Sequence, residues 1–282
     1  MRGVEVGPSF APVLPKSSGA DVTVVDHATA AELRAKYQGH GVDVDAIEDV
    51  DVIWSGGPLI PALESRAPFD FIIASHLLEH LPDPIAFLRD CEALLRPGGL
   101  LSLVLPDSRY CFDCLRPTTT IGQWVDARLG ARTIHTPGAV LDHTLHAAQR
   151  GAIAWEPGSP TPLTMVHQRD HVDAMLAKAE AGEEYIDVHA WVFTRESFLY
   201  LIEMSRTLGF TSFVVADHSD GGSEFFVSLR RAEHAIGADD RAAIFERRLA
   251  TMLGTHRSEP PSGTTVTESE SKGLWRRVRR LR

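Results

Sequence analysis

The stretch from residue 69 to residue 106 limits the possible folds more than any other part of the chain. It begins with the apolar run FDFIIAS, which is typical of a buried strand. Asp83 and Pro84 then favour the start of a helix. In the next segment, IAFLRDCEALL, the apolar side chains share one helical face. RPGG ends that helix, and LLSLVL predicts a second buried strand. Strand, helix and strand in this order predict a right-handed parallel crossover, and therefore an α/β fold.

The segments on either side extend the alternation of strand and helix. Three short apolar runs predict further buried parallel strands, at residues 3–7, 22–26 and 50–54. Thr29 and Glu32 have the spacing of a capping box, so a helix is expected to follow through ELRAKYQ. Near the other end, Thr194 is expected to cap a helix that Gly209 ends. FTSFVVA and EFFVSLR then predict two antiparallel strands joined by DHSDGGS.

The segment between these two regular parts is expected to be an insertion. Residues 107–190 are rich in His, Pro and Thr, and show helical patterns at 121–130, 139–151 and 169–181 with little sign of strands. We predict one domain over residues 1–232, in which 108–190 form a helical insertion or cap. A further helix is predicted over 233–254, followed by a disordered basic tail over 255–282.

Composition excludes several classes of protein. The formal net charge of −10 argues against nucleic acid as a partner, because neutralising phosphates needs a basic face. No apolar run approaches the roughly 20 residues of a membrane helix, and the first residues show no apolar core of a secretion signal. The three cysteines are too few for a disulfide framework, and Cys111 and Cys114 form a lone CxxC pair. A cytoplasmic location is therefore expected.

Three stretches together resemble class I S-adenosylmethionine-dependent methyltransferases, in particular the broad methyltransferase type 11 group. They are VEVGP (4–8), the block from FDFIIAS to VLPD (69–107), and WVFTRESFLYLIEMSRTLGF (191–210). The resemblance implies a Rossmann-like, seven-stranded, mostly parallel sheet with a C-terminal antiparallel hairpin and the helical insertion after the fifth strand. It also implies S-adenosylmethionine as the cofactor.

Gly7 and Asp26 are the first candidates for cofactor binding. Gly7 allows a tight turn beside a ligand, and Asp26 ends the second strand, where a carboxylate can accept hydrogen bonds from ribose hydroxyls. An ordinary turn and a strand-end cap are the alternatives. Trp54 could stack on a base or pack in the core. With the positions that the resemblance adds, the predicted cofactor-binding residues are Glu5, Gly7, Pro8, Asp26, His27, Trp54, Ser75 and His76. The following pair, Glu79 and His80, is expected to support these residues by hydrogen bonding.

Methyl transfer from a sulfonium is an in-line displacement, and a hydroxyl acceptor profits from a general base. The insertion offers several histidines, of which we predict His143, with Asp142 beside it, as the catalytic pair. We predict no metal site. The alternative is an HxxxH site of His167 and His171 completed by Asp170 or His189.

The loop after the fifth strand should lie at the mouth of the pocket. Asp107, Arg109 and Tyr110 in this loop are the predicted substrate-binding residues. Arg109 could pair with an anionic group of the substrate or hold the loop in place.

Three functions fit these features. The first is methyl transfer to a hydroxyl of a sugar or surface-polysaccharide precursor, or to another small molecule, and the resemblance favours the sugar. The second is a catalytically inactive, ligand-binding relative in a biosynthetic complex, since GPSFA (7–11) keeps one glycine where the family usually has GxGxG. The third is a nucleotide-sugar or NAD-dependent enzyme, and the absence of a GxGxxG turn from this sequence argues against it.

The last eleven residues, KGLWRRVRRLR, carry six Lys or Arg and no acid. Their apolar side chains follow helical spacing, so the segment is expected either to be a solvated terminus or to lie on the inner face of the membrane. If it binds membranes, deleting residues 272–282 should reduce sedimentation with anionic liposomes. Equal sedimentation of the full and shortened chains would contradict the membrane contact.

Overall fold

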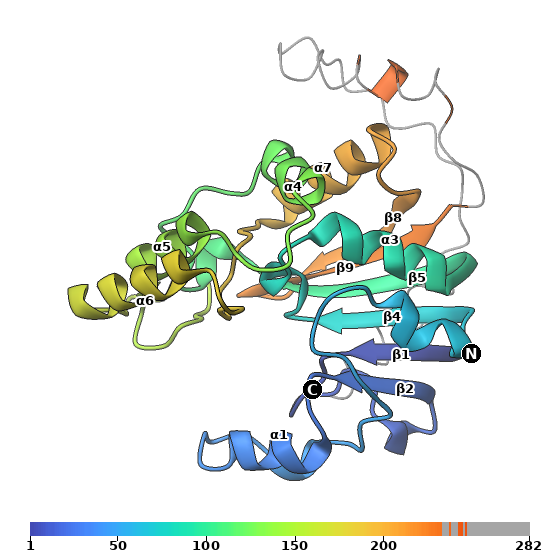
Figure 1. Cartoon of the computed structure of the whole chain (residues 1–282), viewed down its shortest axis with the longest axis horizontal. Coiled ribbons are helices and arrows are strands. Elements are labelled where there is room, and N and C mark those ends of the chain that lie inside the picture. The colour runs from blue at the N-terminus through green and yellow to red at the C-terminus, as the bar shows by residue number, and fades with distance from the viewer. Residues whose placement is uncertain (233–236, 238–241, 245, 247–282) are drawn as a thin grey trace.

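A computed structural model describes residues 1–232, 237, 242–244 and 246. Its main element is a seven-stranded sheet in the order β3-β2-β1-β4-β5-β9-β8 (Figure 1). Strands β1 to β5 are parallel, and β9 is antiparallel to both of its neighbours. The strands are β1 (Arg2–Val6), β2 (Asp21–Asp26), β3 (Val52–Ile53), β4 (Phe69–Ser75), β5 (Leu95–Pro106), β8 (Phe213–Asp220) and β9 (Glu224–Arg231). This arrangement confirms the predicted mostly parallel sheet with its closing hairpin.

Seven α-helices accompany the sheet in the described part of the chain. They are α1 (Ala30–Tyr37), α2 (Ile60–Leu63), α3 (Pro84–Leu94), α4 (Ile121–Leu129), α5 (Pro137–His146), α6 (Arg169–Ala181) and α7 (Arg195–Thr207). Their starts agree with the capping signals in the sequence. The side chains of Thr29, Asp83 and Thr194 each accept a hydrogen bond from a backbone N–H in the first turn of α1, α3 and α7. None of the described helices is long and apolar enough to cross a membrane.

The structure departs from the expected boundaries in a few places. RPGG does not separate α3 from the next strand, because β5 begins at Leu95 and includes these residues, with Gly98 at a φ of 75° and an irregular register against β4. The insertion contains a two-stranded ribbon, β6 (Ala148–Gln149) with β7 (Thr164–Met165), where no strands were expected. Of the helix predicted over 233–254, only residues 237, 242–244 and 246 are described, and the tail 255–282 lies outside the described residues.

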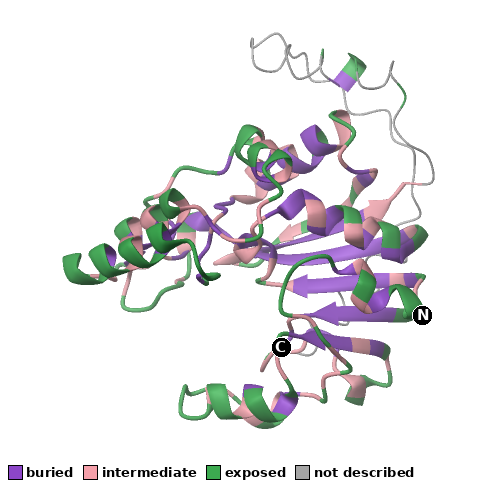
Figure 2. Cartoon of the chain, in the orientation of Figure 1, coloured by how far each residue is buried: buried purple, intermediate pink, exposed green. Residues whose placement is uncertain are grey.

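The main core lies between the sheet and helices α3, α4 and α7. Figure 2 shows the central strands almost entirely buried, whereas the outer faces of α5 and α6 are exposed. Phe198 of α7 is central to this core and is fully buried. The centre of its ring lies 5.3 Å from the ring centre of Phe193, 6.0 Å from that of Phe225 in β9 and 6.3 Å from that of Trp124 in α4. This aromatic group joins the beginning of the insertion to the closing hairpin.

Residues 107–194 connect β5 to α7 and contain the segment predicted as an insertion, 108–190. Figure 1 places α5 and α6 beyond the carboxyl ends of the parallel strands. Hydrogen bonds fix the insertion to the turn after β4. The Trp191 indole donates to the carbonyl of Leu81, at 2.6 Å, and the Ala190 N–H donates to the carbonyl of Glu79, at 2.9 Å. The insertion therefore lies against the same edge of the sheet to which parallel folds bring their ligands.

We expect Phe198→Ala to lower the free energy of unfolding by about 3–5 kcal/mol, because it leaves a cavity among rings that cannot close it. Chemical denaturation followed by circular dichroism measures the change. Leu129→Ala is the control, since Leu129 is 76% exposed and its removal should change stability by less than about 0.5 kcal/mol. Equal effects of the two substitutions would contradict the central position of Phe198.

Candidate functional site

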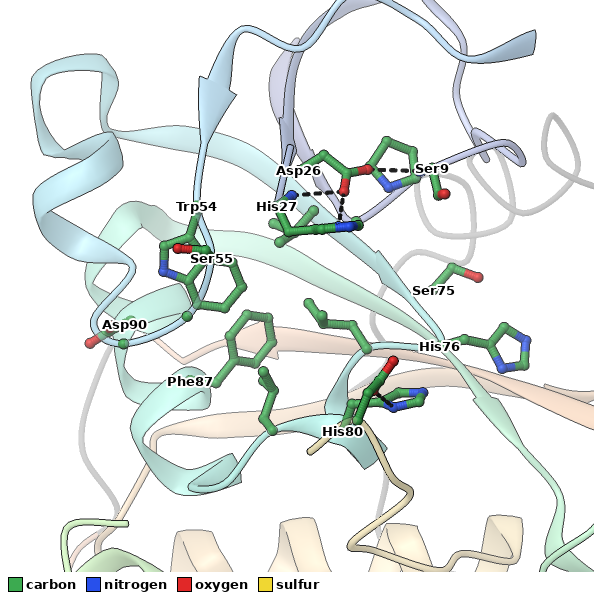
Figure 3. A pocket seen from close by; sticks show the side chains of 18 of the residues that line it. Ser9, Asp26, His27, Trp54, Ser55, Ser75, His76, His80, Phe87 and Asp90 are labelled. Carbon is green, nitrogen blue, oxygen red and sulfur yellow. Dashed lines mark hydrogen bonds and ion pairs between the residues drawn. The ribbon is translucent and has the colours of Figure 1, made fainter. Parts of the chain in front are cut away.

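A pocket of about 1970 Å³ opens at the carboxyl ends of β1 to β4 (Figure 3). In the sheet, β1 lies between β2 and β4, so the chain runs outward in opposite directions from this point. Crevices at such switch points bind nucleotides in open α/β sheets. The volume exceeds the roughly 300–1,000 Å³ of an ordinary ligand pocket, so it can hold a cofactor and a second molecule.

The structure brings most of the predicted cofactor-binding residues together around this pocket. Seven of the eight line it, namely Gly7, Pro8, Asp26, His27, Trp54, Ser75 and His76. Figure 3 shows Trp54 and Phe87 close together on one side of the pocket and His76 and His80 on the other, with Asp26 and His27 at the end of β2. The roles of these residues stay predictions, but their placement fits them.

The Asp26 carboxylate is held firmly at the end of β2. It accepts hydrogen bonds from the backbone N–H groups of Ser9, at 2.9 Å, and His27, at 2.7 Å, and pairs with the His27 ring at 2.7 Å. Its side chain is 2% exposed. A carboxylate has about four acceptor positions, so one remains for a ligand hydroxyl after these three contacts.

Two buried polar atoms support the presence of a polar ligand in the pocket. Within the described residues, neither the Ser9 hydroxyl nor the Trp54 indole nitrogen has a hydrogen-bond partner. Both residues line the pocket. Gly7 has a φ of 71°, and an added Cβ there would meet only a Leu77 methyl, at 3.8 Å. Groups of this kind suit a nucleoside cofactor, whose hydroxyls and base nitrogens can satisfy them.

Backbone strain is also concentrated at the pocket. Ser9, His76 and Ala131 are the non-glycine residues with positive φ in the described part of the chain, at 49°, 49° and 46°. All three line the pocket. Such conformations cost on the order of 1–3 kcal/mol each and gather at functional sites.

Glu5, the eighth predicted residue, lies beneath the pocket rather than in its wall. Its side chain is 1% exposed and accepts hydrogen bonds from the backbone N–H groups of Val13 and Leu14. It thereby fixes the segment that follows the Gly7 turn. Burial raises the pKa of Glu5 to about 7, although the two hydrogen bonds oppose this shift.

A group of imidazoles surrounds a second buried carboxylate, that of Glu79. Its Oε1 lies 3.4 Å from Nδ1 of His76 and 4.0 Å from Nε2 of both His80 and His189. Glu79 is fully buried. His76 and His80 also line the large pocket. This group therefore lies at the border between the pocket and the insertion.

The electrostatics around Glu79 raise the pKa values of His76 and His80. Burial opposes protonation of His76, but ion pairs with Glu224 and Glu79 outweigh it and raise the pKa of His76 to about 9. Burial likewise opposes protonation of His80, and its contacts with Asp187 and Glu79 raise the pKa of His80. The hydrogen bond from His80 lowers the pKa of Asp187 to about 2. The pocket thus presents both positive and negative side chains at this wall.

The predicted catalytic pair lies elsewhere in the insertion. The His143 ring nitrogen Nδ1 accepts a hydrogen bond from the backbone N–H of His189, at 3.2 Å. Burial and the nearby His189 lower the pKa of His143 to about 3. Asp142 points elsewhere, since it is exposed and lies 3.9 Å from the His146 ring. His143 does not line the large pocket, so its role as a base stays a prediction that this placement does not favour.

The three predicted substrate-binding residues form a compact unit after β5. The Arg109 guanidinium binds the Asp107 carboxylate through two hydrogen bonds, at 2.9 and 2.6 Å. It also lies over the Tyr110 ring, 5.4 Å from its centre. These residues are absent from the lining of the large pocket. The contacts match the loop-holding alternative for Arg109, and substrate binding by the three residues stays a prediction.

The other candidate groups of the sequence are not brought together as sites. His167 and His171 stack near the start of α6, with ring centres 4.3 Å apart. Among the described residues, neither belongs to a group of three side chains that could hold a metal ion. Cys91, Cys111 and Cys114 are free thiols.

Sequence reasoning missed the two carboxylates that bind Nδ1 of His80 and His189, on the side of each ring away from Glu79. Asp113 accepts from Nδ1 of His189, at 2.6 Å, and Asp187 pairs with Nδ1 of His80, at 2.7 Å. Neither residue belongs to a motif with its partner, and Asp113 is 76 positions from His189. Only the fold of the insertion brings them together, so the sequence held no local signal for either contact.

A protein-family model matches more than half of the chain. Residues 3–158 match the model of a protein family described as a methyltransferase domain. The matched region includes β1 to β5, the Gly7 turn, Asp26 and the Glu79–His80 pair.

Curated relatives match over a shorter region. The chain is 37% identical over 91 residues to a ubiquinone biosynthesis O-methyltransferase of Xanthomonas axonopodis pv. citri (strain 306), covering 30% of this chain and 34% of that protein. It is 39% identical over 89 residues to the protein of the same name from Xylella fastidiosa (strain 9a5c), covering 29% and 32%. The match thus spans about a third of the length of these relatives.

Solved structures give matches of lower identity. The match to a structure of an S-adenosylmethionine-dependent methyltransferase from Mesorhizobium loti covers 82% of this chain and 90% of that protein's chain, with 16% identity and a TM-score of 0.39. The CcbJ methyltransferase from Streptomyces caelestis covers 82% and 83%, with 13% identity and a TM-score of 0.43. Scores of this size do not by themselves establish a common fold.

We expect the pKa of Glu5 to make stability depend on pH. Since the folded state raises this pKa above its ordinary value of 4.5, the folded state binds the proton more tightly than the unfolded chain. The stabilisation is complete below the ordinary pKa and is lost as pH rises through about 7. The stability of the wild type relative to Glu5→Gln should therefore fall by on the order of a few kcal/mol between about pH 4 and about pH 8.

Urea denaturation of both proteins across this range measures the difference. Glu64→Gln, at an exposed position, is the control. A difference between wild type and Glu5→Gln that stays constant with pH would refute the raised pKa.

Proposed function

Because the chain belongs to the methyltransferase-domain family, whose model matches residues 3–158, we propose that it transfers a methyl group from S-adenosylmethionine to a hydroxyl oxygen of a small molecule. The observation that carries this proposal is the pocket at the switch point of the sheet, where Gly7, Asp26 and Trp54 meet. The ubiquinone biosynthesis relatives, which are named O-methyltransferases, support oxygen as the acceptor atom.

The bound cofactor supplies an electrophilic methyl group on a sulfonium. The protein has to position the acceptor oxygen nearly in line with it and to exclude water, which is mainly a task of orientation. Asp26 is suited to hold the ribose hydroxyls, and the Trp54 ring and indole N–H are suited to the base. Ser75 and His76, at the end of β4, lie in the same pocket on the strand next to β1.

The wall formed by the turn after β4 and the end of the insertion is suited to hold the acceptor. His80, Tyr185 and Asp187 all line the pocket there. The Tyr185 hydroxyl donates to the His80 carbonyl, at 2.9 Å, and lies 3.2 Å from Asp187. These groups can donate to and accept from a hydroxyl, so they can orient an acceptor oxygen and receive its proton.

Two classes of acceptor follow from different sources. The sequence resemblance favours a hydroxyl of a sugar or surface-polysaccharide precursor, whereas the names of the relatives favour an intermediate of ubiquinone biosynthesis. The chain matches only about a third of the length of those relatives, so their names are weak support for a shared substrate. A sugar hydroxyl remains our first choice of acceptor. A catalytically inactive protein that binds the cofactor is the second candidate function, favoured by the single glycine of GPSFA.

Calorimetric titration with S-adenosylmethionine, S-adenosylhomocysteine and NAD tests cofactor binding. We expect binding of both sulfur compounds and none of NAD. Incubation with methyl-labelled cofactor and panels of sugars and phenols then tests transfer. Labelled product from either panel supports the enzyme and identifies the acceptor class. Binding without any transfer favours the inactive protein, and no binding refutes both.

We expect Asp26→Ala to weaken S-adenosylmethionine binding by about tenfold or more, the scale of losing hydrogen bonds to a charged group (~1.5–3 kcal/mol). Asp21→Ala is the matched control, because Asp21 is exposed at the other end of the same strand. Circular dichroism checks that both variants fold. Equal affinity in the two variants would remove Asp26 from the cofactor site.

A further inference from the structure

The Glu79 carboxylate has a feature that methyl transfer does not explain. It is fully buried, and within the described residues no hydrogen bond reaches either of its oxygens. Burying a carboxylate without hydrogen bonds costs several kcal/mol unless a positive charge compensates it. Three imidazoles face Oε1, but the nearest nitrogen is 3.4 Å away and the other two are 4.0 Å away. The carboxylate is thus surrounded by groups that can also bind a cation.

We propose that Glu79, His80 and His189 form a binding site for a divalent transition-metal ion, of which Zn²⁺ suits the ligands best. One donor atom from each of the three side chains lies within 4.8 Å of the other two. Two imidazoles and one carboxylate are a common protein ligand set for Zn²⁺, and metal bonds of 2.0–2.2 Å require donors roughly 3.4 Å apart. Each Nε2 would have to approach Oε1 by only about half an ångström.

The nitrogens that face Glu79 are those a metal would need. The Nδ1 atom of His80 is occupied by Asp187, at 2.7 Å, and that of His189 by Asp113, at 2.6 Å. In the neutral tautomer that donates its Nδ1 hydrogen to the paired carboxylate, each ring has an Nε2 lone pair that can bind a metal ion in place of a proton. A carboxylate behind each ligating histidine is the usual support of a zinc site, since it fixes both the tautomer and the ring orientation.

The support continues one step further around His189. Arg116 binds the other oxygen of Asp113, at 2.6 Å, and also donates to the backbone carbonyl of His189, at 2.8 Å. Asp113 and His189 are buried. The His189 ring is therefore held on both sides by contacts that leave its Nε2 directed toward Glu79. This degree of orientation exceeds what a structural histidine in a core needs.

The softness of the donors distinguishes the ion. Imidazole nitrogens favour zinc and the later first-row metals, whereas magnesium and calcium prefer all-oxygen sites. Three protein ligands leave a coordination position open, as they do in catalytic zinc sites. Because His80 also lines the large pocket, the ion would lie at the pocket wall. The site is independent of the HxxxH pair of His167 and His171 at the start of α6, whose rings stack on each other instead.

Cobalt binding to the full-length chain tests the proposal without depending on activity. The purified protein is treated with a chelator and titrated with Co²⁺, whose visible d–d absorption reports its coordination, and Zn²⁺ is then added in competition. We expect one equivalent of Co²⁺ to produce bands typical of a four- or five-coordinate site with imidazole ligands. Zn²⁺ should abolish these bands.

Variants identify the ligands. Glu79→Gln and His189→Ala should lower Co²⁺ affinity by more than roughly 100-fold, and Asp113→Asn by about 10–100-fold, the usual cost of losing a carboxylate behind a ligating histidine. His171→Ala is the matched control and should bind as the wild type does. Circular dichroism shows which variants fold. If a variant does not fold, the wild-type titration still decides the question.

Three results would overturn the proposal. The first is a wild-type protein that gives no cobalt bands, which would make the group an ion-pair network of Glu79 with protonated imidazoles. The second is unchanged affinity in folded Glu79→Gln and His189→Ala. The third is loss of binding in His171→Ala, which would move the ion to the α6 pair.

Discussion

The position of β1 between two parallel neighbours is the constraint on which the rest of the structure depends. Its pairing with β2 on one side and β4 on the other is in continuous register. All three strands therefore end at the same edge, and the residues that follow them, from the Gly7 turn to Asp26 and Ser75, meet in one place. The insertion then has only one edge of the sheet to cover, because β5 also ends there. The positions of the pocket, the insertion and the imidazole group all follow from this parallel arrangement.

The parts of the fold that could be predicted from sequence are those with local signals. Apolar runs with turn residues identified all seven strands of the main sheet, and Thr29, Asp83 and Thr194 identified helix starts, because capping is decided within four residues. RPGG ends α3 as the sequence predicts, since the helix stops at Leu94, but the strand begins earlier than predicted, at Leu95, which pairs with Phe69 of β4. RPGG itself lies at a register shift between β4 and β5, and regular pairing with β4 and β9 begins at Leu100. A single long-range pair of this kind leaves no local signal in the sequence.

The candidate site divides in the same way. The positions around Gly7 and Asp26 could be found because they follow strands in a known order. The contact of His189 with Glu79, and the carboxylates of Asp113 and Asp187 that pair with His189 and His80, could not be found, since these three residues come from an irregular insertion with no repeating pattern. His143 was chosen for its neighbour Asp142, yet successive residues on a helix point in different directions, and the two side chains diverge. Adjacency in sequence is a poor guide to contact where the backbone is helical.

The hydrogen bonds between the insertion and the turn at Glu79 have a consequence for how the protein folds. His135, Tyr185 and Trp191 donate to, or lie within hydrogen-bond distance of, the carbonyls of His80 and Leu81, and Ala190 bonds the carbonyl of Glu79. A partly folded chain that had completed its sheet but not its insertion would expose the Glu79 carboxylate to water and lack one wall of the pocket. Docking of the insertion therefore both buries Glu79 and completes the pocket wall, so a substitution that loosens the insertion is expected to open the pocket as well.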